Sequence, residues 1–193
     1  MNAFDFEQTL REVGALKDGH FVLTSGRHSD RYVEKFDLLR RPRTTELVCH
    51  ELVSLVAPLK PSVVAGPTTG GILLAFEIAR QLGVAAAYAE RSGRGAEREF
   101  RRGTTFSPGS RVLVVDDIVT TGGSVRETLD ALARHEVDVV GVAVLVDRSG
   151  GQVDFGVPVS ALSQLIIPSW DPDECPLCAR GSIPAKPGSS TAV

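Results

Sequence analysis

The stretch Val112-Leu-Val-Val-Asp-Asp-Ile-Val-Thr-Thr-Gly-Gly-Ser124 combines an apolar run, two carboxylates and a glycine-rich turn. The apolar run is typical of a strand that is buried on both faces of a sheet. After the turn we expect a helix that ends near His135. The order of strand, glycine-rich turn and helix predicts part of a β-α-β unit, with its polar turn at the carboxyl end of the strand.

The same order recurs along the chain after residue 61. Gly66-Pro-Thr-Thr-Gly-Gly71 is a second glycine-rich turn, and it precedes a helix predicted from Ile72 to about Leu82. Nearly continuous Val, Leu and Ala strands joined by helices are typical of a parallel sheet that is covered on both faces. We therefore predict an α/β fold with a doubly wound parallel sheet from about residue 61 to 167. The apolar runs that would form its strands are 63–65, 84–88, 112–115 and 137–146.

The two ends of the chain lie outside this alternation. The N-terminal part contains two predicted helices and two short strand-like pieces, at 4–16, 42–56, 21–26 and 31–34. Residues 182–193 are rich in proline, glycine and serine, which predicts a disordered tail. We expect the whole chain, 1–193, to form a single domain.

The composition restricts the class of protein. The chain has 193 residues and a mass of 20.6 kDa, which fits one domain. Its 42% hydrophobic and 23% charged residues are typical of a soluble globular protein. No apolar run approaches the roughly 18 residues of a membrane span, and no basic and apolar leader follows Met1. Three cysteines are too few for a disulfide framework, so the cytoplasm is the expected location.

The charged residues suggest which anions the chain can bind. The formal net charge of −3 argues against general nucleic-acid binding, which requires a basic surface. Only four of the 21 basic residues are lysines, so anions would be bound mostly by arginine. Five of the arginines lie in the basic loop, residues 91–102. Such a segment between two strands is either a solvated loop or a lid that brings guanidinium groups onto a polyanion.

The two glycine-rich turns are candidate phosphate sites. In residues 120–124 glycines let backbone N–H groups converge, hydroxyls add donors, and the helix start adds a positive dipole end. Asp116 and Asp117 would repel a phosphate, so we expect them to accept hydrogen bonds from the hydroxyls of a sugar that carries it. The turn at Thr68–Gly71 is a weaker signal. An ordinary strand-to-helix turn with polar caps is the alternative for each.

Residues 112–124 resemble the phosphoribosyl pyrophosphate (PRPP) motif of the type I phosphoribosyltransferases. Three further segments are similar to the orotate-specific branch of that family: Phe21–Ser29 to its N-terminal hood, Gly66–Ile72 to its pyrophosphate loop, and Val146–Gly151 to a strand end whose arginine meets the orotate carboxylate. The likeness covers about residues 5–167. It implies the type I phosphoribosyltransferase fold, with a small hood over about residues 1–60 and a core over about 61–167.

The resemblance also implies an activity. The reaction would transfer the phosphoribosyl group of PRPP to orotate, giving orotidine 5′-monophosphate and pyrophosphate, in de novo pyrimidine synthesis. Mg²⁺ would be the cofactor, bound mainly through PRPP. The chain would form a homodimer in which the basic loop reaches the neighbouring subunit's site. Neither nucleic acid nor a membrane is an expected partner.

Site residues follow from the resemblance by position. Asp116 and Asp117 would hold the ribose hydroxyls, and they are catalytic candidates together with the loop cation Arg94. Arg148 and Thr120 would face orotate, because a guanidinium matches a carboxylate in two hydrogen bonds. No residue is assigned as a metal ligand. The other predicted substrate-binding residues are Ser25, Thr68, Thr69, Gly70, Gly71, Arg91, Ile118, Val119, Thr121, Gly122, Gly123 and Ser124.

The chain departs from the orotate pattern where that branch has lysines. Thr24 stands at the hood position, Gly70 in the pyrophosphate loop and Ser92 in the basic loop. Two other interpretations therefore stay open: a phosphoribosyltransferase for another base, and a PRPP-binding regulator without turnover. The candidates for the replaced loop cation are Arg94, Arg98, Arg101 and Arg102.

The cysteines and histidines give only a weak signal. Cys175-Pro-Leu-Cys178 is one Cys-x-x-Cys pair, which by itself cannot fill a tetrahedral zinc site. We expect reduced thiols, with zinc shared between two chains or a redox pair as alternatives. Only His28, in the hood segment, would approach substrate. No ligand spacing is visible among His20, His28, His50 and His135.

Overall fold

The computed structural model describes residues 4–93 and 97–187. The chain divides into two compact units. The larger unit is Leu39–Leu165, and the smaller unit joins the two chain ends, Met1–Leu38 and Ile166–Val193. The helix expected over residues 42–56 thus lies in the larger unit and not in the unit that contains the N-terminus. In the part of the chain that the structure describes, no helix is both long enough and apolar enough to cross a membrane.

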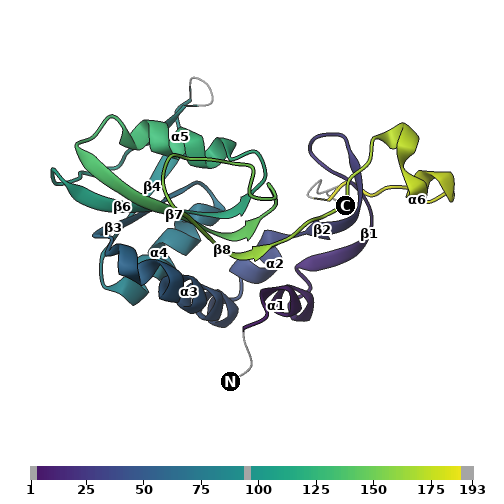
Figure 1. Ribbon diagram of the computed structural model, residues 1–193, viewed down its shortest axis with the longest axis horizontal. Coiled ribbons are helices and arrows are strands. Elements are labelled where there is room, and N and C mark those ends of the chain that lie inside the picture. Colours follow the sequence, from purple (N-terminus) through teal and green to yellow (C-terminus); the bar gives the residue numbers. More distant parts are fainter. Residues whose placement is uncertain (1–3, 94–96, 188–193) are drawn as a thin grey trace. The chain divides into compact units, whose positions relative to one another are not determined.

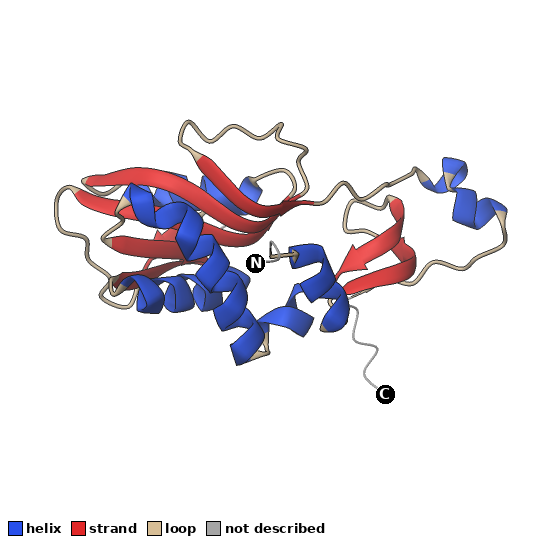
Figure 2. Cartoon of the chain, turned by 60° about the horizontal axis from the view of Figure 1, so that its bottom comes forward, coloured by secondary structure: helices blue, strands red, loops and turns tan. Residues whose placement is uncertain are grey.

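A six-stranded sheet forms the centre of the larger unit (Figure 1). Its strands are β3 (Val63–Pro67), β4 (Ala85–Arg91), β5 (Arg98–Phe100), β6 (Ser110–Val119), β7 (Val137–Asp147) and β8 (Val159–Gln164). The strand order is β5-β4-β3-β6-β7-β8, and every neighbouring pair is parallel except β4 and β5. Figure 2 shows how the strands twist across the sheet, as sheets of L-residues do.

Helices cover both faces of this sheet. The helices α3 (Pro42–Val56) and α4 (Gly70–Leu82) lie on one face, and α5 (Gly123–Leu132) lies on the other (Figure 1). A short 3-10 turn, η1 (Ala57–Leu59), follows α3. The arrangement confirms the predicted α/β fold with a doubly wound, mostly parallel sheet.

The centre of the core lies around strand β6. Val112 and Val114 are fully buried, and they pack with Val142 and Val144 of β7 and with Leu132 of α5. Because both faces of β6 are covered by apolar side chains, its two buried polar residues lie at its carboxyl end. The fold therefore brings the two aspartates of the quoted stretch to one edge of the sheet.

The basic loop has more structure than a solvated loop. Strand β4 extends to Arg91, and Arg98–Phe100 forms the antiparallel edge strand β5, which no hydrophobic pattern had indicated. Phe100 packs edge-on against Phe106 and His135, with ring centroids 5.0 and 5.9 Å away. This aromatic contact anchors the returning strand. Part of the predicted loop thus forms an antiparallel strand pair, and residues 94–96 lie outside the described residues.

Two other expectations differ from the structure. Helix α5 ends at Leu132 and not near His135, because a turn at Ala133–His135 follows it. Strand β8 was not expected as a separate strand, since its sequence Val-Ser-Ala-Leu-Ser-Gln contains few strongly apolar residues. It is an edge strand with half-exposed side chains, for which a continuous apolar run is not required.

The smaller unit is built around a hairpin. It contains α1 (Phe6–Glu12), β1 (Leu16–Val22), β2 (His28–Val33), α2 (Lys35–Leu39), η2 (Pro172–Glu174) and α6 (Pro176–Ala179). Asp5 caps α1 by accepting a hydrogen bond from the N–H of Gln8 at 3.0 Å. Strands β1 and β2 pair antiparallel. The strand-like pieces expected at 21–26 and 31–34 are wrong in their bounds, because residues 23–26 form the hairpin turn.

The C-terminal segment attaches to this hairpin. Trp170 pairs with His28, and Ala185 pairs with Phe21. Ala185 lies within residues 182–193, for which disorder is the expectation. It is ordered instead, because its N–H donates to the carbonyl of His20 at 2.8 Å. Residues 188–193 of the predicted tail lie outside the described residues.

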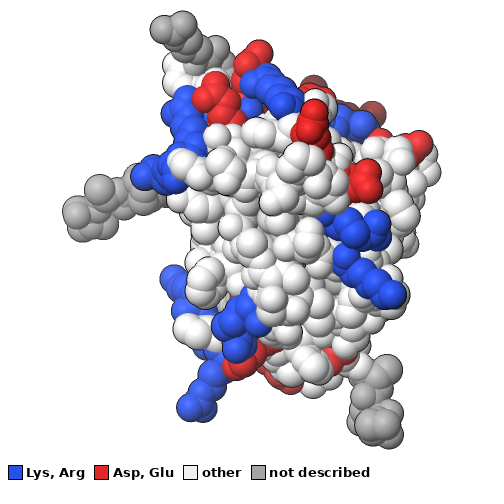
Figure 3. Space-filling model, turned by 90° about the vertical axis from the view of Figure 1, so that its left-hand side faces the viewer, with Lys and Arg blue, Asp and Glu red and all other residues white. Residues whose placement is uncertain are grey.

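Figure 3 shows one face of the molecule, with basic and acidic side chains mixed around an uncharged central area. On the side shown, the described residues form no continuous basic surface. This mixture agrees with the small net charge of −3.

Candidate active site

The first predicted phosphate turn lies between β6 and α5. Gly122 has a φ of 78°, and a side chain there would also collide with Phe155 and Val153, so only glycine fits. The turn leads directly into the first residue of α5, Gly123. The N–H groups at this helix start point out of the helix and are available to an anion.

A cavity of about 300 Å³ opens at this turn. It is lined by all the residues from Ile118 to Val125, together with Asp116, Arg91 and Glu127. The structure therefore brings a helix start, three hydroxyl residues, two carboxylates and an arginine to one small cavity. The hydroxyl-bearing side chains of Thr120 and Thr121 are exposed to it.

The two aspartates sit at the carboxyl end of β6. Asp116 is 6% exposed and Asp117 is 3% exposed. The carboxylate Oδ1 of Asp116 accepts a hydrogen bond from the N–H of Asp117 at 2.9 Å. This bond fixes the orientation of the Asp116 side chain at the edge of the cavity.

The second turn, Thr68–Gly71, approaches the first. A side chain on Gly70 would collide with the Oδ2 of Asp117, and one on Gly71 would meet Pro67. Only glycines allow the start of α4 to come this close to the end of β6. The turn itself contains a cis peptide bond between Thr68 and Thr69. The structure thus brings the two predicted phosphate turns together at one edge of the sheet.

A buried arginine supports the second turn. Arg98 is 3% exposed, and its Nη1 donates to the Oγ1 of Thr68 at 3.1 Å and to the carbonyl of Ala89 at 3.2 Å. Its Nε donates to the Oε2 of Glu127 on α5 at 3.0 Å. Arg98 therefore connects β5, the second turn and α5, and its buried guanidinium cannot move freely toward a ligand.

The other loop arginines differ in their surroundings. Arg91 is exposed and lines the cavity at the first turn. Arg101 and Arg102 form exposed ion pairs with Glu99 and Glu90. The hydrogen bond from Arg102 lowers the pKa of Glu90. Arg94, the predicted catalytic loop cation, lies outside the described residues, as do the two residues after it.

Arg148 follows strand β7 directly. Its backbone N–H donates to the carbonyl of Val119 at 2.8 Å, so it lies beside the end of β6 and next to the first turn. Asp147 orients this strand end by accepting hydrogen bonds from the N–H and hydroxyl of Ser149 at 2.7 and 2.6 Å. The backbone of Arg148 thus lies close to Thr120, and a contact of these two residues with the base stays a prediction.

Ser25 belongs to the smaller unit. It is exposed in the turn between β1 and β2, where its hydroxyl accepts a hydrogen bond from the N–H of Arg27 at 3.4 Å. Thr24, which stands at a hood lysine position, is exposed in the same turn.

Sequence reasoning missed Glu127 and the supporting role of Arg98. Glu127 comes four residues after Gly123, one turn along α5, and this spacing places it on the helix face above the phosphate turn. That periodicity was the available signal for Glu127. For Arg98 no local signal existed, because its partners are 9, 29 and 30 residues away along the chain.

Comparison with known proteins gives a consistent result. A family model described as "Phosphoribosyl transferase domain" matches residues 49–156. The orotate phosphoribosyltransferase of Thermotoga maritima is 43% identical over 183 residues, covering 95% of this chain and 97% of that protein. That of Heliobacterium modesticaldum is 49% identical over 184 residues, covering 94% of this chain and 95% of that protein.

A solved structure agrees with the sequence matches. The crystal structure of orotate phosphoribosyltransferase from Aeropyrum pernix superposes with a TM-score of 0.71 at 29% identity, and covers 83% of this chain and 94% of that one. The matches extend over both the sheet with its two turns and nearly all of the remaining chain. The chain therefore belongs to the orotate phosphoribosyltransferase family, within the phosphoribosyltransferases.

Proposed function

We propose that the chain transfers the phosphoribosyl group of PRPP to orotate, giving orotidine 5′-monophosphate and pyrophosphate. Family membership over nearly the whole chain supports this activity. The observation in the structure that carries it is the cavity of about 300 Å³ shared by Asp116, Arg91 and the turn at Thr120–Ser124. The groups that would bind a phosphate and a sugar hydroxyl therefore lie within one cavity.

Each group at the site has a role in binding PRPP. The backbone N–H groups and hydroxyls of Thr120–Ser124 would hold the 5′-phosphate at the start of α5. Asp116 and Asp117 would accept hydrogen bonds from the ribose hydroxyls, since ionised carboxylates are acceptors only. The turn at Thr68–Gly71, held by Arg98, would hold the pyrophosphate.

The reaction exchanges one bond at C1 of the ribose for another. The bond from C1 to the pyrophosphate oxygen breaks, and N1 of orotate, which enters as its anion, forms the new bond. Positive charge develops on the ribose, and negative charge develops on the leaving pyrophosphate. Catalysis would then depend mainly on electrostatic stabilisation by fixed donors and by the loop arginines Arg91 and Arg94.

Arg148 would recognise the base. Its backbone lies beside the end of β6, and its planar guanidinium could donate two parallel hydrogen bonds to a carboxylate. Orotate carries a carboxylate, whereas uracil and the purine bases do not. This residue would therefore favour orotate over those bases.

The residues at the site also fit Mg²⁺. Asp116 supplies hard carboxylate oxygens at the cavity edge, and Mg²⁺ is commonly bound by one or two carboxylates together with substrate phosphates. Bound mainly through PRPP, the ion would neutralise part of the charge of the leaving pyrophosphate.

A homodimer is part of the proposal. The packed helices α3 and α4 expose large apolar side chains: Leu47 (48%), Leu55 (49%), Leu73 (42%) and Phe76 (66%). Exposed apolar side chains favour association with a partner where they form a common surface. A second copy of the chain is the partner that the family resemblance implies.

The deciding experiment is an absorbance assay with purified protein, Mg²⁺ and PRPP. Orotate, uracil, adenine and hypoxanthine would be tested as separate substrates, with omission of PRPP as the control. We expect consumption of orotate alone. Turnover of a purine without turnover of orotate would favour a phosphoribosyltransferase for another base, and PRPP binding without turnover of any base would favour a regulator.

A further inference from the structure

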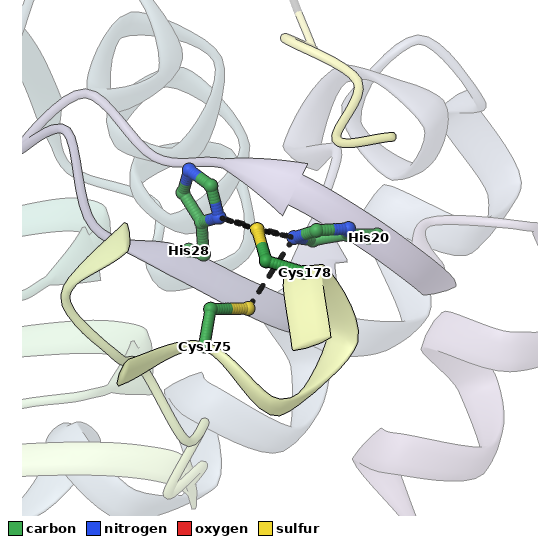
Figure 4. Close-up of side chains that lie close together, drawn as sticks. All are labelled: His20, His28, Cys175 and Cys178. Atoms are coloured by element: carbon green, nitrogen blue, oxygen red, sulfur yellow. Dashed lines mark hydrogen bonds between the residues drawn. The ribbon is translucent and has the colours of Figure 1, made fainter. Parts of the chain in front are cut away.

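Four potential metal ligands converge in the smaller unit (Figure 4). His20 lies on β1, and His28 begins β2. Cys175 immediately precedes α6, and Cys178 lies within it. One ligand atom from each residue lies within 4.8 Å of all the others. The proposed transferase site uses none of these side chains, apart from the expectation from sequence that His28 would approach substrate.

The distances between these atoms match those of a tetrahedral zinc site. The His20 Nε2 atom is 3.1 Å from the His28 Nδ1 atom. Three of the four nitrogen-to-sulfur distances are 3.4 Å from Cys175 to His20, 3.8 Å from Cys178 to His20 and 3.3 Å from Cys178 to His28. Ordinary Zn–N and Zn–S bonds at tetrahedral angles give about 3.3 Å between two nitrogens and about 3.6 Å between nitrogen and sulfur.

Three of the four residues in the cluster are shielded from water, and Cys178 is partly buried. Cys175 is 2% exposed, His20 is 7% exposed and His28 is 8% exposed. The sequence showed no ligand spacing for the histidines because they meet across the β1–β2 hairpin. His28 pairs with Val22, two residues beyond His20, which brings both rings to the same side. The ring centroids are 5.0 Å apart.

The C-terminal segment offers little other means of attachment. Within its described part, residues 166–187, Cys175 is the single buried residue. The segment is otherwise held by polar contacts, such as the Arg27–Asp171 ion pair and the hydrogen bond from the Ser29 hydroxyl to the Pro168 carbonyl. A small unit made of two distant parts of the chain is the kind of structure that a metal ion commonly stabilises.

We propose that His20, His28, Cys175 and Cys178 bind a structural Zn²⁺ ion within one chain. Two nitrogen and two sulfur ligands in a tetrahedral arrangement are typical of zinc. All four positions would be taken by protein side chains, so the ion would have no open position for substrate and would act by holding the chain ends together. This extends the single Cys-x-x-Cys pair to a complete ligand set, without a second chain.

The experiment measures zinc in untagged protein purified without a chelator from zinc-supplemented medium. We expect about one zinc ion per chain when the metal content is measured by elemental mass spectrometry. The variant Cys175→Ser with Cys178→Ser should lose it. The matched controls, His50→Ala at an exposed histidine and Cys49→Ala at the third cysteine, should keep it.

A measurement on the unmodified chain guards against variants that fail to fold. Protein grown with cobalt in zinc-depleted medium should show the visible absorption of tetrahedral Co²⁺ and a thiolate-to-cobalt charge-transfer band. A chain that is metal-free under both growth conditions would overturn the proposal. So would zinc retained by the double cysteine variant, or a Cys175–Cys178 disulfide found in the metal-free chain.

Discussion

Asp117 is held at the end of β6 with almost no exposure, directly against Gly70. We predict that Asp117→Asn lowers kcat/KM for PRPP by more than about tenfold, or about 1.4 kcal/mol. The substitution keeps the size of the side chain but replaces an acceptor with a group that also donates, so one hydroxyl contact is lost. Steady-state kinetics measure the effect. Asp138→Asn, at an exposed position on β7, is the matched control and should leave kcat/KM unchanged.

Arg148 should affect the base and not PRPP. We predict that Arg148→Ala raises KM for orotate by more than about tenfold and leaves KM for PRPP nearly unchanged, because the lost hydrogen bonds are made to the carboxylate. Arg134→Ala, which removes an exposed arginine, is the control. Wild-type kinetics in the Arg148 variant would remove this residue from the substrate site.

Cys49 on α3 gives a pH-dependent prediction. Burial raises the pKa of this thiol to about 12, with Glu77 as a further cause. In the unfolded chain the thiol ionises near pH 9. Because the folded state holds its proton more tightly, the stabilisation is fully present below about pH 9 and is lost as the pH rises toward 12.

The measurement compares unfolding of the wild type and Cys49→Ala in urea. From about pH 9 to about pH 10.5 the free energy of unfolding of the wild type should fall by about 1.5 kcal/mol more than that of the variant. Other groups that titrate in this range are common to both proteins and cancel in the difference. Parallel pH profiles would show that the folded thiol ionises normally.

At the level of elements, Arg98 connects β5, the turn before α4, and α5. We predict that Arg98→Ala lowers the free energy of unfolding by about 3 kcal/mol. The reason is that Thr68, Ala89 and Glu127 each lose the buried guanidinium that donates a hydrogen bond to them. It should also raise KM for PRPP, since the turn at Thr68–Gly71 loses its support. Urea denaturation and steady-state kinetics test the two effects.

Arg101→Ala is the control for this prediction. Arg101 forms an exposed pair with Glu99, so its loss should change stability by no more than about 0.5 kcal/mol. Equal effects of the two substitutions would mean that Arg98 contributes only its charge and not its buried contacts.

The same elements show what could be predicted from sequence. The strand, turn and helix around residues 112–124 were predictable because apolar run, glycines and helix follow one another within a few positions. Strand β5 was missed because Phe100 is anchored by Phe106 and His135, and β8 was missed because an edge strand carries no continuous apolar run. Local patterns could not indicate contacts of this kind.

The candidate active site and the four-residue cluster also differ in how far apart their residues lie along the sequence. Asp116 and the turn at Thr120–Ser124 lie together in the sequence and in the cavity, so this candidate phosphate site could be predicted. His20 lies 155 residues before Cys175 in sequence. The four-residue cluster depends on the pairing of a hairpin and on a C-terminal segment that attaches to it, and neither is visible in residue spacing.

At the scale of the whole molecule, the exposed apolar side chains of α3 and α4 predict self-association. The wild type should have about twice the 20.6 kDa mass of one chain by light scattering after size-exclusion chromatography. Phe76→Glu should shift it to the monomer, because burying an unpaired carboxylate at an apolar contact costs several kcal/mol. Phe76 is 66% exposed within one chain, so the substitution need not disturb folding of the monomer.

A second exposed apolar residue separates this effect from a general effect of added charge. Ile183 is 90% exposed and lies in the smaller unit, so Ile183→Glu should leave the mass unchanged. The resemblance implies that the basic loop reaches the neighbouring subunit's site, so monomeric Phe76→Glu should also lose most of its kcat while its circular dichroism spectrum stays that of the wild type. A monomeric wild type, or a dimer that persists in Phe76→Glu, would show that these helices do not form the contact between chains.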